Sequence, residues 1–229
     1  INLPQIALTV EGDEEKFWNL LTERLELCKE ALMCRHYSLL GTTSDVSPIH
    51  WKYGAITRLQ PGEKVDKLLK GGYSTLSLGY IGIYETTKII RKASNTTKEG
   101  REFAIKLMKR LREETDKWKK ETGLGFILYA TPEESLGYEF ARIDKEKFGT
   151  VKDITDKGYY TNSYHADKRE NMDVFSQLSF ENDFQKISLG GAKSCIEISK
   201  IDKNSTTLED ILRFVYDNTQ YAGFDIKNI

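Results

Sequence analysis

The chain has 229 residues, of which 39% are hydrophobic and 30% charged, and its formal net charge is −1. This balance is typical of a soluble globular protein and argues against a basic nucleic-acid-binding surface. No apolar run approaches the ~20 residues that a membrane helix requires, and no secretion signal stands at the start. The 3 cysteines form no CxxC pair, which predicts a reducing, cytoplasmic setting without a cysteine zinc site.

Hydrophobic periodicity predicts an alternation of helices and strands. Helices are expected at 14–40 with Asp13 as N-cap, at 61–69, at 84–92, at 98–121, after Thr131, and from the capping box at 206–209. Strands are expected within 73–83, at 125–129, at 194–198 and near the end at 224–229. The segment 154–165 reads as irregular. This order favours an α/β fold with parallel strand pairs, formed by residues 1–229 as a single piece.

Several individual positions carry narrower expectations. Cys28 and Cys34 are expected to be small buried hydrophobes within the first long helix, and Leu212 is expected to face inward from the last helix. Gly79 and Gly82 are expected to permit close backbone approach. The first residues, INLP, show no cap of their own in this interpretation.

Residues 125–135 read GFILYATPEES and are the most informative stretch. An apolar strand runs directly into a helix start, where Thr131 can serve as N-cap and Pro132 suits the first turn. The free N–H groups and the helix dipole at such a corner suit a phosphate or another anion. The alternative is an ordinary capped turn between a strand and a helix.

Four phrases together resemble the catalytic subunit of the anaerobic (class III) ribonucleotide reductases. They are NLPQIAL at 2–8, SLGYIGIYE at 77–85, YATPEES at 129–135 and TDKGYYTNS at 155–163. Each phrase alone is a weak signal, but their order and approximate spacing also resemble those of the family.

The resemblance implies a portion of the ten-stranded α/β barrel that glycyl-radical enzymes share. It implies conversion of ribonucleoside triphosphates to 2′-deoxyribonucleoside triphosphates with formate as reductant, a glycyl radical, a zinc site, and a radical-SAM iron–sulfur activase as partner. The family's finger-loop cysteine would precede Ile1, and its zinc cysteines and radical glycine would follow Ile229. We therefore expect the C-terminal half of the barrel, with no cofactor or metal within this chain and no turnover by the chain alone.

The resemblance also implies which residues face the reacting ribose. Glu134 matches the glutamate of the family's phrase and is expected to line the ribose or formate site, where a carboxylate can accept the 3′-hydroxyl proton. Tyr129 is expected to orient the substrate or to join a proton path. Asn2 is expected to hydrogen-bond a ribose hydroxyl. The competing interpretations are a helix-dipole glutamate, a core tyrosine and a frayed chain end.

Substrate binding is assigned to hydroxyl groups near the same corner. Thr131 and Ser135 are expected to bind the substrate phosphates, and Ser77 is a further substrate-binding candidate on the preceding strand. The alternatives are a plain N-cap and a solvated serine. His165 is expected to be a surface or hydrogen-bonded residue, because no second ligand stands at metal spacing.

Two other functions stay open on the sequence. One is a glycyl-radical enzyme that acts on a non-nucleotide substrate, and the other is a nucleotide-binding or assembly module without chemistry. A half barrel would expose strand edges and apolar surface, so we also expect a homo-oligomer.

Overall fold

The computed structural model describes residues 1–130, 134–191, 193–198, 206–219 and 223–228. Its α-helices are α1 (Leu3–Thr9), α2 (Glu14–Leu39), α3 (Pro48–Trp51), α4 (Ile83–Arg91), α5 (Lys98–Thr122), α6 (Glu134–Phe148), α7 (Val174–Gln185) and α8 (Thr206–Asn218). Its strands are β1 (Thr75–Gly79), β2 (Gly125–Tyr129), β3 (Lys193–Ile198) and β4 (Gly223–Asn228), and short 3₁₀ turns lie at Ser44–Val46, Val65–Leu69 and Lys168–Glu170. Among these residues, no helix combines the length and the apolar character that crossing a bilayer would require.

The strands form two parallel pairs. β1 pairs with β2, which places Gly79 opposite Tyr129 at their carboxyl ends, and β3 pairs with β4. Because parallel neighbours need a crossover connection, α4 and α5 join β1 to β2, and α8 joins β3 to β4. The N–H of Gly190 donates to the carbonyl of Leu128 at 2.7 Å, so the chain that enters β3 lies beside β2. The predicted α/β fold with parallel strand pairs is confirmed.

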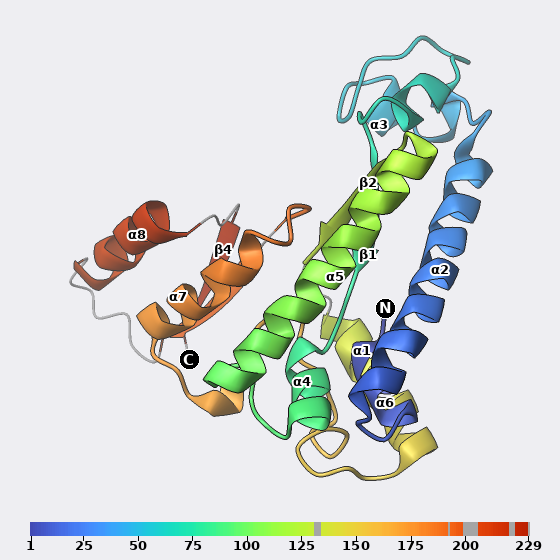
Figure 1. The fold of residues 1–229 in the computed structure, drawn as a ribbon. Coiled ribbons are helices and arrows are strands. Elements are labelled where there is room, and N and C mark those ends of the chain that lie inside the picture. Colours follow the sequence, from blue (N-terminus) through green and yellow to red (C-terminus); the bar gives the residue numbers. More distant parts are fainter. Residues whose placement is uncertain (131–133, 192, 199–205, 220–222, 229) are drawn as a thin grey trace.

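The two long helices run side by side along the β1–β2 pair (Figure 1). The rings of Phe17 and Phe103 lie 6.1 Å apart, and the Lys117 amine lies 3.5 Å from the Glu26 carboxylate. Because the residue numbers rise together along both helices, α2 and α5 are parallel. The buried stripe of α5 includes the five predicted residues Phe103, Leu107, Met108, Leu111 and Trp118. Its last member contacts Phe126 of β2 edge to face, with ring centroids 5.5 Å apart.

The described chain from α7 onward lies to one side of α5 (Figure 1). α7, α8 and β3 share a small core of Leu178, Ile196 and Ile211. Tyr164 stacks on Phe184 of α7 with ring centroids 5.6 Å apart, which joins this part to the irregular segment before it. The packing therefore continues from the first strand pair to the second.

The structure corrects two expectations about the helices. The chain does not open without a cap: Asn2 is the N-cap of α1, and its side-chain oxygen accepts a hydrogen bond from the Gln5 N–H at 3.1 Å. The hydrophobic pattern also predicts no helix at α7, because Glu181 and Gln185 are buried together with its apolar residues and interrupt the helical spacing. In contrast, the Asp13 cap of α2 is confirmed by its bond to the Lys16 N–H.

Three single positions also differ from expectation. Cys34 is exposed, because the buried stripe of α2 follows Phe17, Leu21 and Leu25 and passes Cys34 by. Leu212 is 48% exposed, since its neighbour Ile211 takes the inward position on α8. Gly79 has open space where a Cβ would stand, so it is not a site of close approach, whereas Gly82 is one.

Candidate active site

The N-terminal phrase packs against the segment that follows β1. Asn2 forms a parallel bridge with Ile81, whose N–H donates to the carbonyl of Ile1 at 3.1 Å. Gly82 comes next with a φ of 85°, and a Cβ at this position would overlap the ring of Pro4. Glycine is the residue that adopts this conformation without steric cost, so the glycine permits the contact between the two phrases.

The TDKGYYTNS phrase lies on the other side of the same segment. Ile81 forms an antiparallel bridge with Asn162, and the Gly82 N–H donates to the Thr161 carbonyl at 3.0 Å. The residues between β1 and α4 are therefore held between two backbone segments that lie far apart in the sequence. The backbone N–H and carbonyl groups of Ile81 and Gly82 are all hydrogen-bonded, which holds this part of the site in place.

Helix α6 begins within the YATPEES phrase and packs against the TDKGYYTNS phrase. The Tyr160 N–H donates to the Gly137 carbonyl at 3.1 Å, and a Cβ on Gly137 would lie 2.8 Å from the Tyr160 carbonyl oxygen. The absent side chain therefore lets α6 approach the TDKGYYTNS phrase closely. Figure 1 shows α1, α4 and α6 gathered at one end of the β1–β2 pair. The described parts of the four phrases thus lie near the carboxyl ends of two parallel strands.

Asp144 of α6 links three of these segments through its buried carboxylate. Its Oδ2 accepts hydrogen bonds from the Asn2 amide at 3.0 Å and from the Tyr160 hydroxyl at 2.9 Å. Its Oδ1 accepts a bond from the Gln5 amide at 2.6 Å. Burial and then the charge of Asp144 raise the pKa of Tyr160 far above its usual range. The phenol therefore stays a hydrogen-bond donor at any ordinary pH.

A second buried cluster joins α4 to the TDKGYYTNS phrase. The Lys157 side chain is 2% exposed, and its amine is paired with the carboxylates of Glu85 and Asp167, both 0% exposed. The guanidinium of Arg169 donates to Asp167 at 2.9 Å. Burial alone would raise the pKa of Asp167, but the bonds from Lys157 and Arg169 lower it to about 2. Asp167 therefore remains ionised in the folded chain, and the ion pairs of the cluster fix the phrase against α4.

Two of the predicted catalytic residues are brought to this end of the molecule. Asn2 is half-buried, bridged to Ile81 and bonded to Asp144. Tyr129 ends β2 opposite Gly79 and is 36% exposed. The backbone therefore places both residues beside the carboxyl end of β1, and their catalytic roles stay predictions.

The other four predicted residues are Thr131, Glu134, Ser135 and Ser77, and the structure describes the side-chain environment of the two serines only. Thr131 lies outside the described residues. Glu134 begins α6, and its side chain is also outside what the structure describes. Ser135 is exposed in the first turn of α6. Ser77 is half-buried in the middle of β1, opposite Ile127. Their assignment to catalysis and substrate binding stays a prediction.

Asp144 is not among the site residues predicted from the sequence. One signal was available, because Gly137, Ala141 and Asp144 recur at helical spacing on the buried stripe of α6. An acidic residue on an apolar stripe has to find buried partners, since an unpaired buried charge is costly. The identity of those partners could not be read from the local sequence.

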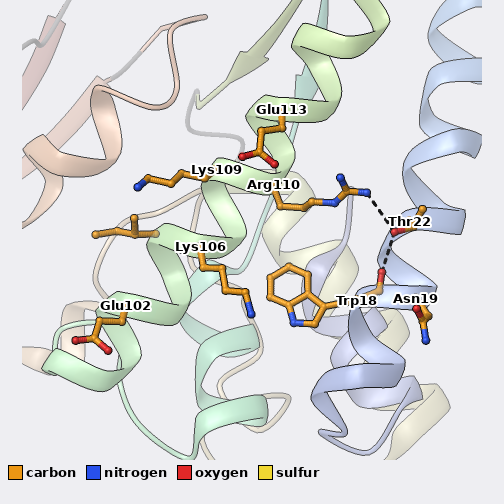
Figure 2. Close-up of a pocket in the computed structure, with 9 residues that line it drawn as sticks. Trp18, Asn19, Thr22, Glu102, Lys106, Lys109, Arg110 and Glu113 are labelled. Atoms are coloured by element: carbon orange, nitrogen blue, oxygen red, sulfur yellow. Dashed lines mark hydrogen bonds between the residues drawn. The ribbon is translucent and has the colours of Figure 1, made fainter.

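A separate hollow of about 570 Å³ lies between α2 and α5 (Figure 2). The Arg110 guanidinium reaches Thr22 at 3.4 Å, and the Lys106 amine lies 4.8 Å from the ring centroid of Trp18. All the residues that line it come from these two helices and none from the four phrases. This groove is therefore distinct from the candidate site.

Comparison with known proteins identifies the family of the chain. A family model described as "Anaerobic ribonucleoside-triphosphate reductase" matches residues 1–228. The chain belongs to this family. It is 40% identical over 226 residues to the anaerobic ribonucleoside-triphosphate reductase of Escherichia coli (strain K12), covering 97% of this chain and 32% of that protein. It is 38% identical over 231 residues to the enzyme of Enterobacteria phage T4, covering 99% of this chain and 37% of that protein.

Solved structures of anaerobic ribonucleotide reductases share the fold. One superposes with a TM-score of 0.71 at 24% identity, covering 99% of this chain and 34% of that chain. The Thermotoga maritima reductase with MES in its active site gives a TM-score of 0.70 at 24% identity, covering 99% of this chain and 36% of that chain. The predicted fold, an α/β portion of the reductase barrel, agrees with this likeness. The chain spans about a third of the length of the curated relatives it matches.

Proposed function

We propose that this chain carries ribonucleotide-facing elements of an anaerobic reductase that converts ribonucleoside triphosphates to 2′-deoxyribonucleoside triphosphates. The observation that carries the proposal is the convergence of four phrases at one end of parallel strands, in a chain that belongs to this family. Parallel α/β sheets and barrels bind their ligands at the carboxyl ends of the strands. The reaction belongs to the whole reductase, and the chain alone is expected to turn nothing over.

Five of the six predicted residues have a specific role at the proposed site, and Ser77 is a further candidate for substrate binding. The Asn2 amide hydrogen-bonds a ribose hydroxyl, and the Glu134 carboxylate accepts the proton of the 3′-hydroxyl. The Tyr129 phenol orients the substrate or joins the proton path. Thr131 and Ser135 bind phosphate oxygens at the N-terminus of α6, where the helix dipole favours negative charge.

The radical and metal chemistry is assigned to parts of the reductase other than this chain. Within the described ranges, no group of three or more His, Cys, Asp or Glu side chains is arranged to hold a metal ion. Cys28 and Cys34 both lie on α2, which contains none of the four phrases. We propose formate as the reductant, a glycyl radical as the radical source, and a radical-SAM iron–sulfur activase as the partner that generates it.

We also propose that the chain self-associates and acts in the cytoplasm. Among the described strands, β1 pairs only with β2 and β4 only with β3, so each has a second edge without a strand partner. Such edges invite pairing with another chain. Sedimentation velocity at increasing protein concentration tests this, and a monomer at every concentration would contradict it.

The phosphate assignment is tested by calorimetric titration of the chain with CTP. We expect the double variant Thr131→Ala/Ser135→Ala to lose CTP binding, because it removes two hydroxyl donors at the proposed phosphate site. Ser176→Ala is the matched control, since Ser176 is also exposed in the first turn of a helix, α7, that contains none of the phrases. Equal CTP affinities for the double variant and the control would remove the phosphate site from the proposal.

A further inference from the structure

We propose that Asp144 is a positioning residue that fixes the side-chain amide of Asn2 so that an N–H group, and not the carbonyl oxygen, points toward the ligand. This inference rests on the proposed function, because it deepens the role of Asn2 at the ribonucleotide site. It assigns to Asp144 no contact with the substrate.

Hydrogen bonds at both ends of the Asn2 amide define its orientation. The Gln5 N–H donates to Oδ1 at 3.1 Å, while Nδ2 donates to the Asp144 carboxylate at 3.0 Å. The flipped amide would place its NH₂ group against the Gln5 N–H and its oxygen against the carboxylate. Both contacts would then be repulsive, because donor would face donor and acceptor would face acceptor. One amide orientation therefore satisfies both neighbours.

This arrangement leaves one hydrogen-bond donor available on Asn2. An amide nitrogen carries two hydrogens, and Asp144 accepts one of them. In the described part of the chain, the second hydrogen has no partner, and Asn2 is only half-buried. A ribose hydroxyl oxygen is an acceptor of the kind that this N–H would bind.

Asp144 is itself held in place by other residues, so it can hold the Asn2 amide in a fixed orientation. Asp144 is 0% exposed, and its two carboxylate oxygens accept three hydrogen bonds, two from the N-terminal phrase and one from Tyr160. Substitution by asparagine keeps most of this network, because the carbonyl oxygen can accept from Asn2 and Tyr160. The new NH₂ group would then face Gln5, whose own amide can turn to present its oxygen. Substitution by alanine removes every acceptor.

The test uses the ¹⁵N-labelled chain, with CTP as the probe and the Asn2 side-chain amide as the NMR reporter. In the wild-type chain, one of the two Asn2 amide hydrogens should exchange with water more slowly than the other. In Asp144→Ala, both should exchange rapidly and CTP should bind about fivefold more weakly, the effect of one hydrogen bond. Asp144→Asn should bind CTP within about twofold of wild type. Glu146→Ala, an exposed acidic residue of the same helix, is the control.

The outcomes separate the two proposals. Equal exchange of the two hydrogens in the wild-type chain would overturn the positioning role, whether or not the alanine variant folds. If CTP shifts the Asn2 signal but Asp144→Ala binds CTP as tightly as Glu146→Ala, the role of Asp144 is also overturned while the proposed function stands. If CTP leaves the wild-type Asn2 signal unchanged, the proposed ribonucleotide site fails.

Discussion

Replacing Lys157 by methionine would remove the cation that two buried carboxylates share. The Lys157 amine is paired with Glu85 and Asp167 and lies 4.9 and 4.6 Å from the ring centroids of Tyr84 and Tyr159. Methionine has an unbranched side chain of similar length and can fill the space between the rings. It donates no hydrogen bond, so Lys157→Met isolates the electrostatic contribution from the packing.

The loss of stability in Lys157→Met should come mainly from Glu85, which would lose its cation. Asp167 keeps the guanidinium and the backbone N–H of Arg169, each at 2.9 Å. Glu85 keeps only the Thr161 N–H at 2.9 Å and hydroxyl at 2.8 Å, both on Oε1, while its Oε2 has no partner in the described part of the chain. Removal of one partner from a buried ion pair costs about 3–5 kcal/mol. Because Asp167 retains a cation, we expect a loss of about 3 kcal/mol in the free energy of unfolding.

Urea unfolding followed by tryptophan fluorescence and circular dichroism measures this loss. Lys152→Met is the matched control, because Lys152 is an exposed lysine in the same segment. The double variant Lys157→Met/Glu85→Gln should be more stable than Lys157→Met, since it removes the uncompensated charge. A loss below about 1 kcal/mol for Lys157→Met, or one equal to that of Lys152→Met, would refute the reasoning.

Two further predictions concern the same region. Gly82→Ala should lower the free energy of unfolding by about 2–4 kcal/mol, because alanine at a φ of 85° is strained and its Cβ would overlap Pro4. The control Gly72→Ala has a similar φ of 78° but open space around the Cβ, so it should lower that free energy by about 1 kcal/mol. Equal thermal unfolding midpoints for the two variants would contradict this prediction. Burial lowers the pKa of His165, but the charge of Glu181 and its hydrogen bond at 2.9 Å raise it overall above the ordinary 6.5. A raised folded-state pKa stabilises the chain below the unfolded value, and this stability is lost as pH rises through the folded value. Between about pH 6 and about pH 9, wild type should therefore lose more stability than His165→Gln, and parallel stability curves would count against the ion pair.

The local sequence determined most of the long helices and the strands, and the phrases that identify the family. The helical spacing of Phe103, Leu107, Leu111 and Trp118 predicts α5, and the strand prediction at 125–129 coincides with β2. These signals are local, because periodicity, caps and turn residues act within a few positions of each other. The order of the four phrases is likewise a property of the sequence.

The tertiary structure alone decided which of those residues meet. Asn2 and Asp144 are separated by 142 positions, and Glu85 and Lys157 by 72. Nothing near Asp144 in the sequence names its partners, because buried polar groups are satisfied by whichever segments the fold brings to them. The packing of α7 against the segment that contains Tyr164 likewise depends on the tertiary structure. Elements follow from short-range chemistry, whereas the pairing of charges and amides depends on how the chain crosses itself at the carboxyl ends of β1 and β2.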